Sequence, residues 1–123
     1  MAWKKVSQEL SDFLAAALKL FVCQKKMMFG CPFYFVNNNM FTGLHQDSIF
    51  VRLAEAERQQ LRAEFDEAAP FEPMPGMIMK EYLILPESLY HNPELFHNWL
   101  NRSYRYGASL PVKVSKARRN KQK

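Results

Sequence analysis

The chain has 123 residues, a length typical of one domain, and 48% of them are apolar, so a core can form without disulfide or metal support. The net charge is +5, from 17 basic and 12 acidic residues, but six of the basic residues and no acidic residue lie between positions 112 and 123. The rest of the chain therefore holds 11 basic and 12 acidic residues, which gives no indication of a basic folded surface.

The N-terminal segment predicts an amphipathic helix. Its apolar residues recur at spacings of three and four, as on one face of a helix: Trp3, Val6, Leu10, Phe13, Ala17, Leu20 and Phe21. The same segment has some likeness to a signal peptide ending at Cys23, but Glu9, Asp12 and Lys19 interrupt its apolar run. We therefore expect no targeting signal, and no apolar run is long enough to span a bilayer.

A sheet is predicted to follow this helix. Gly30 and Pro32 interrupt any helix, so the stretch KKMMFGCPFYFV (25–36) is interpreted as the junction between the helix and the first strand. Turn-forming residues at Asn37–Asn39 and Gln46-Asp47 favour two tight hairpins. The pattern predicts a three-stranded antiparallel meander at about 33–36, 40–45 and 48–53.

The second half of the chain predicts further elements of both kinds. A mostly solvated helix is expected from Ala54 to Phe65, and the prolines and glycine of 70–76 exclude a helix there. We expect a short edge pairing at Phe71-Glu72, a strand at 80–85, and a single turn after Pro86. A last helix should begin at Asn92-Pro93-Glu94 and end at Gly107.

This order of elements predicts an α+β domain at 1–110, a two-layer sandwich in which helices cover an antiparallel β-sheet. The residues from 111 to 123 form a basic C-terminal tail, which we expect to be disordered because it is rich in charge and has few apolar residues. The two cysteines, Cys23 and Cys31, are interpreted as reduced thiols of a cytoplasmic protein; a strained bridge between them is the alternative.

Several short motifs resemble the N-terminal domain of the TfoX/Sxy family, over roughly residues 5–110. They are Met28-Phe29-Gly30 before the first strand, Met40-Phe41 opening the second, Arg52 in the third, the segment from Phe71 to Gly76, and Met79, Tyr82 and Pro86 beyond it. The resemblance implies the order α-β-β-β-α-β-β-α, no enzymatic activity and no cofactor. Family members include regulators of natural competence, which carry a second, helical C-terminal domain that we do not expect in this chain.

The residues themselves give no indication of catalysis or metal binding. Cysteines and histidines are scattered over five segments, although Cys31 and His45 would approach each other if the first two strands pair. His45 near Asp47 resembles a general base oriented by a carboxylate, but hairpin ends commonly carry such polar pairs. The chain has no nucleophile elbow and no phosphate-binding loop, so we expect no catalytic residue, no metal and no small-molecule substrate.

The loop PMPGMIM (73–79) is a candidate partner-binding site through Met74, Met77 and Met79. Methionines on a loop stiffened by proline offer an adaptable apolar surface. The alternative is that Met77 and Met79 fill the end of the core.

The C-terminal region is a second candidate site, for nucleic acid. Basic side chains there would neutralise phosphates: Arg102, Arg105, Lys113, Lys116, Arg118, Arg119 and Lys121. The alternative is a solvated tail that binds nothing.

Together these observations predict a cytoplasmic, non-catalytic regulatory or protein-interaction module that binds a protein partner or a second copy of itself, and no membrane. The alternative function is that of a nucleic-acid-binding accessory protein acting through its basic tail.

Overall fold

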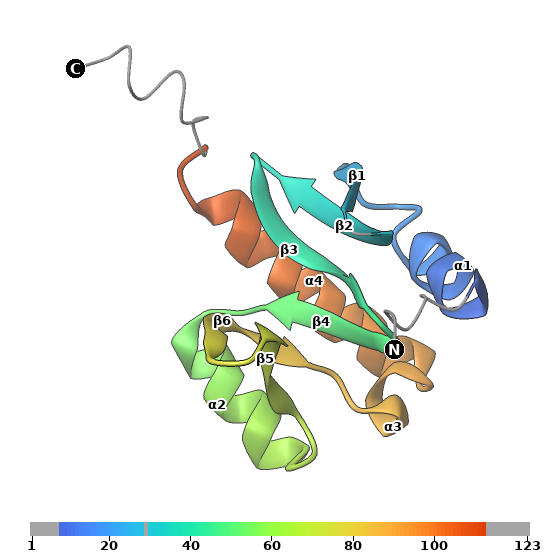
Figure 1. Ribbon diagram of the computed structural model, residues 1–123. Helices are drawn as coiled ribbons and strands as arrows, with labels where there is room; N and C mark the ends of the chain where they lie inside the picture. The colour runs from blue at the N-terminus through green and yellow to red at the C-terminus, as the bar shows by residue number, and fades with distance from the viewer. Residues whose placement is uncertain (1–7, 29, 113–123) are drawn as a thin grey trace.

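The computed structural model describes residues 8–28 and 30–112 (Figure 1). Within these residues lie the helices α1 (Gln8–Ala17), α2 (Glu55–Glu64), α3 (Glu87–Tyr90) and α4 (Pro93–Ser109). The strands are β1 (Gln24–Met28), β2 (Cys31–Val36), β3 (Asn39–His45), β4 (Ser48–Arg52), β5 (Ala69–Met74) and β6 (Met77–Ile84).

The six strands form one sheet in the order β1-β2-β3-β4-β6-β5, and every neighbouring pair is antiparallel. Strands β1 to β4 follow one another as a meander, and α2 connects β4 to the β5–β6 hairpin. The α+β class and the antiparallel sheet predicted from the sequence are confirmed.

Turn residues in left-handed backbone create the hairpins of the meander. Asn37 and Asn38 have φ of 53° and 62° in the turn between β2 and β3, and Gln46 has φ of 57° between β3 and β4. Asparagine tolerates this conformation better than most residues because its short polar side chain can bond locally. Both hairpins therefore form where the sequence predicted them.

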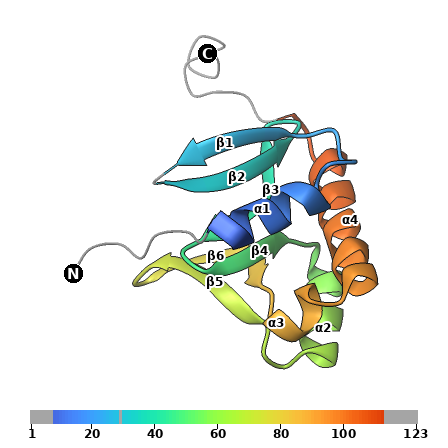
Figure 2. The ribbon, with the colours of Figure 1, turned by 90° about the vertical axis from the view of Figure 1, so that its right-hand side faces the viewer.

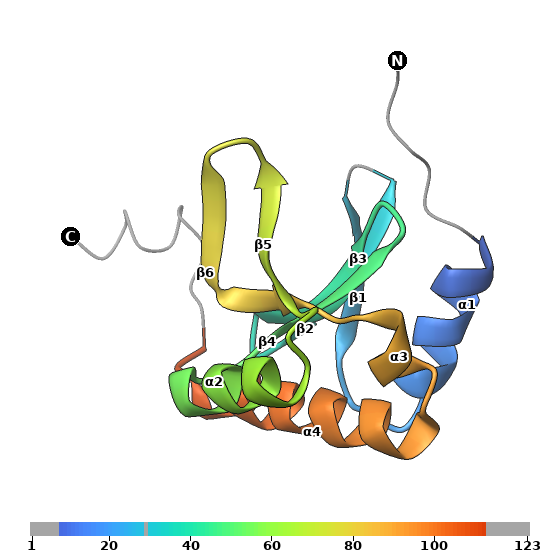
Figure 3. The same ribbon diagram turned by 90° about the horizontal axis from the view of Figure 1, so that it is seen from below.

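One face of the sheet packs against the helices and forms the main core. Figure 3 shows α2 and α4 in a layer below the sheet, with the β5–β6 hairpin extending away from them. Trp99 and Leu100 of α4 are fully buried against this face, together with Phe41 of β3. Leu14 of α1 belongs to the same core, and Figure 2 shows α1 lying across the strands beside α4. A helix layer over the sheet was predicted, but the apolar stripe predicted for the first helix omitted Leu14 and included Leu20, which is 89% exposed and lies beyond the end of α1.

Strand β1 was not predicted. The sequence reading placed residues 25–28 at the junction of the first helix and the first strand, whereas they pair with β2 along their whole length. Four of the five residues of β1 are exposed, so the strand lacks the alternation of buried and exposed residues that identifies a strand in a sequence. With β1 and the short helix α3, the order becomes α-β-β-β-β-α-β-β-α-α.

Helix α4 begins where predicted and ends later. The Oδ1 atom of Asn92 accepts a hydrogen bond from the Leu95 N–H at 3.2 Å, and Pro93 occupies the first turn. The predicted end at Gly107 is wrong by two residues, because the helix continues to Ser109. Gly107 is buried inside the helix, so its role is in packing.

The remaining elements lie close to their predicted positions. Phe71-Glu72 belongs to β5, and the strand predicted at 80–85 is the second half of β6. Cys23 and Cys31 are both free thiols, so the alternative of a bridge between them is wrong. The apolar stripe predicted for the first helix includes Trp3 and Val6, which lie outside the described residues.

Candidate functional site

The face of the sheet opposite the helices carries a second apolar cluster. Its buried members all come from strands: Cys31, Phe33, Phe50, Phe71 and Tyr82. Within the described part of the chain, no helical residue belongs to this cluster. The sheet thus has an apolar second face without the layer of helices that covers its first face.

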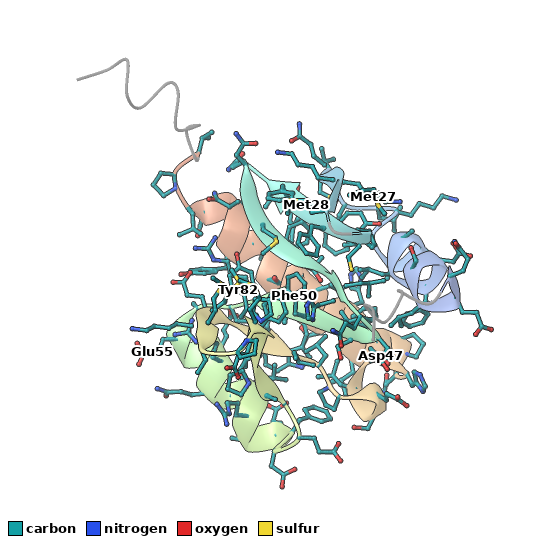
Figure 4. The ribbon with its side chains drawn as sticks, in the orientation of Figure 1. Met27, Met28, Asp47, Phe50, Glu55 and Tyr82 are labelled. Atoms are coloured by element: carbon teal, nitrogen blue, oxygen red, sulfur yellow. The ribbon has the colours of Figure 1, made fainter. Side chains whose placement is uncertain are left out.

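Aromatic rings form the base of this face. Phe50 stacks on Phe71 with ring centroids 4.3 Å apart and planes 12° from parallel. Phe33 meets Phe50 edge to face at 5.6 Å, and Tyr82 meets it at 5.8 Å. These are the offset and edge-to-face arrangements that aromatic pairs prefer. Figure 4 shows Phe50 and Tyr82 close together at the centre of the sheet.

Gly43 lets these rings lie directly on the backbone of β3. A Cβ atom at this position would lie 2.9 Å from Cδ1 of Phe33 and 3.0 Å from Cζ of Phe50. It would also lie 2.9 Å from the Pro32 carbonyl oxygen. The absence of a side chain at Gly43 is therefore what brings the rings of β2 and β4 together above β3.

Above the aromatic base lies an apolar groove with a volume of about 400 Å³. One wall comes from the β1–β3 part of the sheet and the other from the β5–β6 hairpin. The residues that line the groove are Met28, Cys31, Phe33, Met40, His45, Phe71, Pro73, Met74, Met77 and Met79. Five methionines from four strands therefore surround one cavity, and we call it the methionine groove.

The β5–β6 hairpin holds its methionines at the open edge of the groove. Gly76 adopts φ of 83° in the turn, and its N–H donates a hydrogen bond to the Glu72 carboxylate at 2.7 Å. Met74 and Met77 are paired across the turn and are 51% and 49% exposed. Met79 packs against the aromatic cluster.

The structure thus brings together the three methionines that the sequence singled out. The alternative, in which they fill the end of a core, describes Met79 and not the half-exposed Met77. Sequence reasoning missed the opposite wall, with Met28 and Met40. The unpredicted strand β1 brings Met28 to the groove.

Polar groups in the groove are few. The His45 ring meets Phe71 edge to face at 5.4 Å, and burial lowers the pKa of its imidazole. The Tyr82 hydroxyl donates to the Met40 carbonyl at 2.9 Å, and burial raises the pKa of this hydroxyl. Among residues 8–28 and 30–112, no three His, Cys, Asp or Glu side chains gather into a metal-binding group. The chemistry of the groove is thus suited to apolar contact.

We expect the environment of His45 to make the stability of the domain depend on pH. Because the folded-state pKa is lowered, the unfolded chain takes up a proton at higher pH than the folded chain does. Stability is therefore lost as the pH falls below the ordinary histidine value of about 6.5. Urea denaturation should show a lower free energy of unfolding at pH 5.5 than at pH 7.5.

The variant His45→Gln should reduce that loss. His91→Gln changes an exposed histidine and serves as the control, which should leave the loss in place. An equal loss in wild type and His45→Gln would assign the effect to other groups.

The groove lies within a region that matches a known family. The model of the TfoX N-terminal domain matches residues 15–106, three quarters of the chain. The chain belongs to the TfoX N-terminal domain family. The resemblance seen in the sequence motifs is thus confirmed, and the matched region includes every strand of the sheet.

The other comparisons add no relative. No curated protein and no solved structure matches the chain. Among the helices of the described residues, none has both the length and the apolar character that a membrane span requires.

Arg52, one of the residues that carry the family resemblance, ties the sheet to α4. Its guanidinium contacts the Glu81 carboxylate at 2.6 Å, and the Tyr106 hydroxyl donates to the same carboxylate at 2.8 Å. Burial raises the pKa of Glu81, but the hydrogen bonds from Tyr106 and Arg52 and the charges of Arg52 and Arg58 outweigh it and lower the pKa. These contacts give Arg52 a structural role, because they join β4, β6 and α4.

The two described arginines of the candidate nucleic-acid site lie on α4, in the helix layer and away from the methionine groove. The Arg102 guanidinium lies 4.4 Å from the centre of the Trp99 ring and donates to Gln60 at 2.9 Å. Arg105 is exposed. Both line a polar hollow between α2 and α4 that also contains Glu57. The other candidates, Lys113, Lys116, Arg118, Arg119 and Lys121, lie outside the described residues.

Proposed function

We propose that this member of the TfoX N-terminal domain family is a cytoplasmic, non-catalytic regulatory module, and that its methionine groove binds apolar side chains of a protein partner. The single observation that carries the proposal is the groove itself, with its aromatic base and five methionines. Family membership supports a competence-regulator-like role for the domain.

The chemistry of the groove favours a protein ligand. Methionine side chains are flexible and polarisable, and binding surfaces that adapt to apolar partners use them for that reason. A volume of about 400 Å³ is enough for a few apolar side chains. With Met74 and Met77 half-exposed at its edge, the groove exposes apolar surface that a partner would cover. Five of the seven basic residues of the nucleic-acid alternative lie outside the described residues, so the groove carries the proposal.

The test replaces the exposed edge of the groove and measures partner binding. In Met74→Gln/Met77→Gln, two apolar side chains become polar at positions where little packing is lost. We expect proteins captured by the full chain, after crosslinking in cells, to bind this variant at least about tenfold more weakly, since hot-spot side chains each contribute more than about 1 kcal/mol.

Ile78→Gln is the matched control. Ile78 is 56% exposed and lies between Met77 and Met79 in β6, but it faces the hollow beside α2 and does not line the groove. This variant should retain every partner. Equal capture by wild type and both variants would contradict the proposal, and a dimer that dissociates only in the groove variant would identify a second copy as the ligand.

A further inference from the structure

The two outer strands of the sheet differ in how open their edges are. Strand β5 contains Pro70 and Pro73, which lack an N–H, and its pairing with β6 is irregular at two places. Prolines and irregular pairing protect an edge from further strands. Strand β1 has neither proline nor irregularity, and Figure 2 shows it as an outer strand beside β2.

Within residues 8–28 and 30–112, no strand pairs with the outer edge of β1. Its five residues are in register with β2 throughout. Among the described residues, no backbone hydrogen bond links β1 to any segment other than β2. Alternate backbone N–H and C=O groups of β1 therefore face away from the sheet, ready for another strand.

The side chains of β1 determine which side chains a strand that pairs with it should have. Lys26 and Met28 lie opposite Phe33 and Cys31, so they belong to the groove face. The Nζ of Lys26 lies 4.8 Å from the centre of the Phe35 ring on that face. Lys25 and Met27 lie on the other face, so each face carries one lysine and one methionine.

We propose that β1 accepts an extended segment of a protein partner as a seventh strand, and that this segment carries two adjacent acidic residues next to two apolar ones. In antiparallel pairing the apolar residues lie opposite Met28 and Met27, and the acidic residues lie opposite Lys26 and Lys25. Opposite charges and apolar pairs across neighbouring strands are favourable, and like charges are unfavourable.

The same lysines disfavour a second copy as the occupant. Antiparallel pairing of two β1 strands centred on Lys26 places the two Lys26 side chains opposite each other. In that register a second copy is disfavoured by like charges, whereas an acidic segment is favoured. This inference deepens the proposed function, because Met28 belongs both to β1 and to the groove.

The probe is a fluorescent peptide, TTVVEETT, which presents the required pattern, and the protein is the full chain. Binding measured by fluorescence anisotropy should weaken at least tenfold in Lys25→Glu/Lys26→Glu. That variant should instead prefer TTVVKKTT. The control Lys19→Glu/Lys80→Glu has the same net charge change at two exposed lysines and should bind TTVVEETT nearly as well as wild type does.

Backbone methylation of the peptide tests the strand geometry without any protein variant. Only alternate N–H groups of an added strand point toward β1. Of two peptides N-methylated at neighbouring valines, one should therefore lose binding and the other should keep it.

Loss of binding with neither or both methylated peptides, no exchange of preference on charge reversal, or no binding at all would overturn the strand model. Failure of the proposed function looks different. If Met74→Gln/Met77→Gln keeps all partners while the charge and methylation tests succeed, the partner binds β1 and not the groove.

Discussion

Replacing Phe50 with alanine is expected to destabilise the domain by about 3–5 kcal/mol, the usual cost of truncating a fully buried phenylalanine. Phe50 is 0% exposed and contacts Phe33, Phe71 and Tyr82 on the groove face. Its removal leaves a cavity beneath the methionine groove that the rigid strands close only in part. Thermal unfolding should show a midpoint lower by roughly 10–20 °C.

Phe35→Ala is the matched control, on the same face of the sheet. Phe35 is only partly buried and packs at the periphery of the cluster, beside Lys26. Its truncation should cost less, because a side chain at the periphery leaves a smaller enclosed cavity when it is removed. Should Phe35→Ala prove as destabilising as Phe50→Ala, the aromatic rings around Phe50 would not be the centre of a packed second core. Phe50→Leu, which retains most of the volume, should fall between the two.

The sequence predicted the strands of the meander whose residues are mostly apolar and buried on both faces, and it failed where the side chains of a strand are exposed. In β4, Ile49 and Val51 enter the main core while Phe50 faces the groove, so this strand appears in the sequence as a short apolar run after turn residues. In β1, the lysines and methionines are mostly exposed. Only the pairing with β2, a contact of tertiary structure, makes this segment a strand.

The candidate site was predictable in part for the same reason. The prolines and Gly76 identified the loop that holds Met74 and Met77, because turn chemistry is local. The other wall of the groove comes from Met28 and Met40, which are distant in the sequence from the hairpin and line the same groove only in the folded sheet. No local pattern predicts that meeting, and the apolar residues of the groove face look in the sequence like ordinary core residues.

Gly107 shows how one residue type supports two interpretations. A glycine late in a helical pattern usually ends the helix, because it adopts left-handed backbone readily. Here it stays helical and permits α4 to lie close to the sheet. A Cβ atom at Gly107 would lie 2.9 Å from Cγ1 of Val36 and 3.4 Å from Cβ of Phe41. The Asn39 amide also donates to the Gly107 carbonyl at 3.3 Å, which fixes the same approach.

Gly107→Val should therefore destabilise the domain by about 2–4 kcal/mol, since overpacking a dense core costs about 1–3 kcal/mol and the branched side chain adds strain. Ala108→Val is the control, because Ala108 is exposed one position further along α4, and valine there lowers helix propensity whereas valine in place of Gly107 does not. Its free energy of unfolding in urea should fall by less than about 1 kcal/mol. If Gly107→Val loses no more stability than Ala108→Val, the close approach of α4 to β2 and β3 does not restrict the side chain at position 107. A larger loss in Gly107→Val than in Ala108→Val would show that the close packing of α4 on β2 and β3 stabilises the domain. That packing uses the face of the sheet opposite the methionine groove.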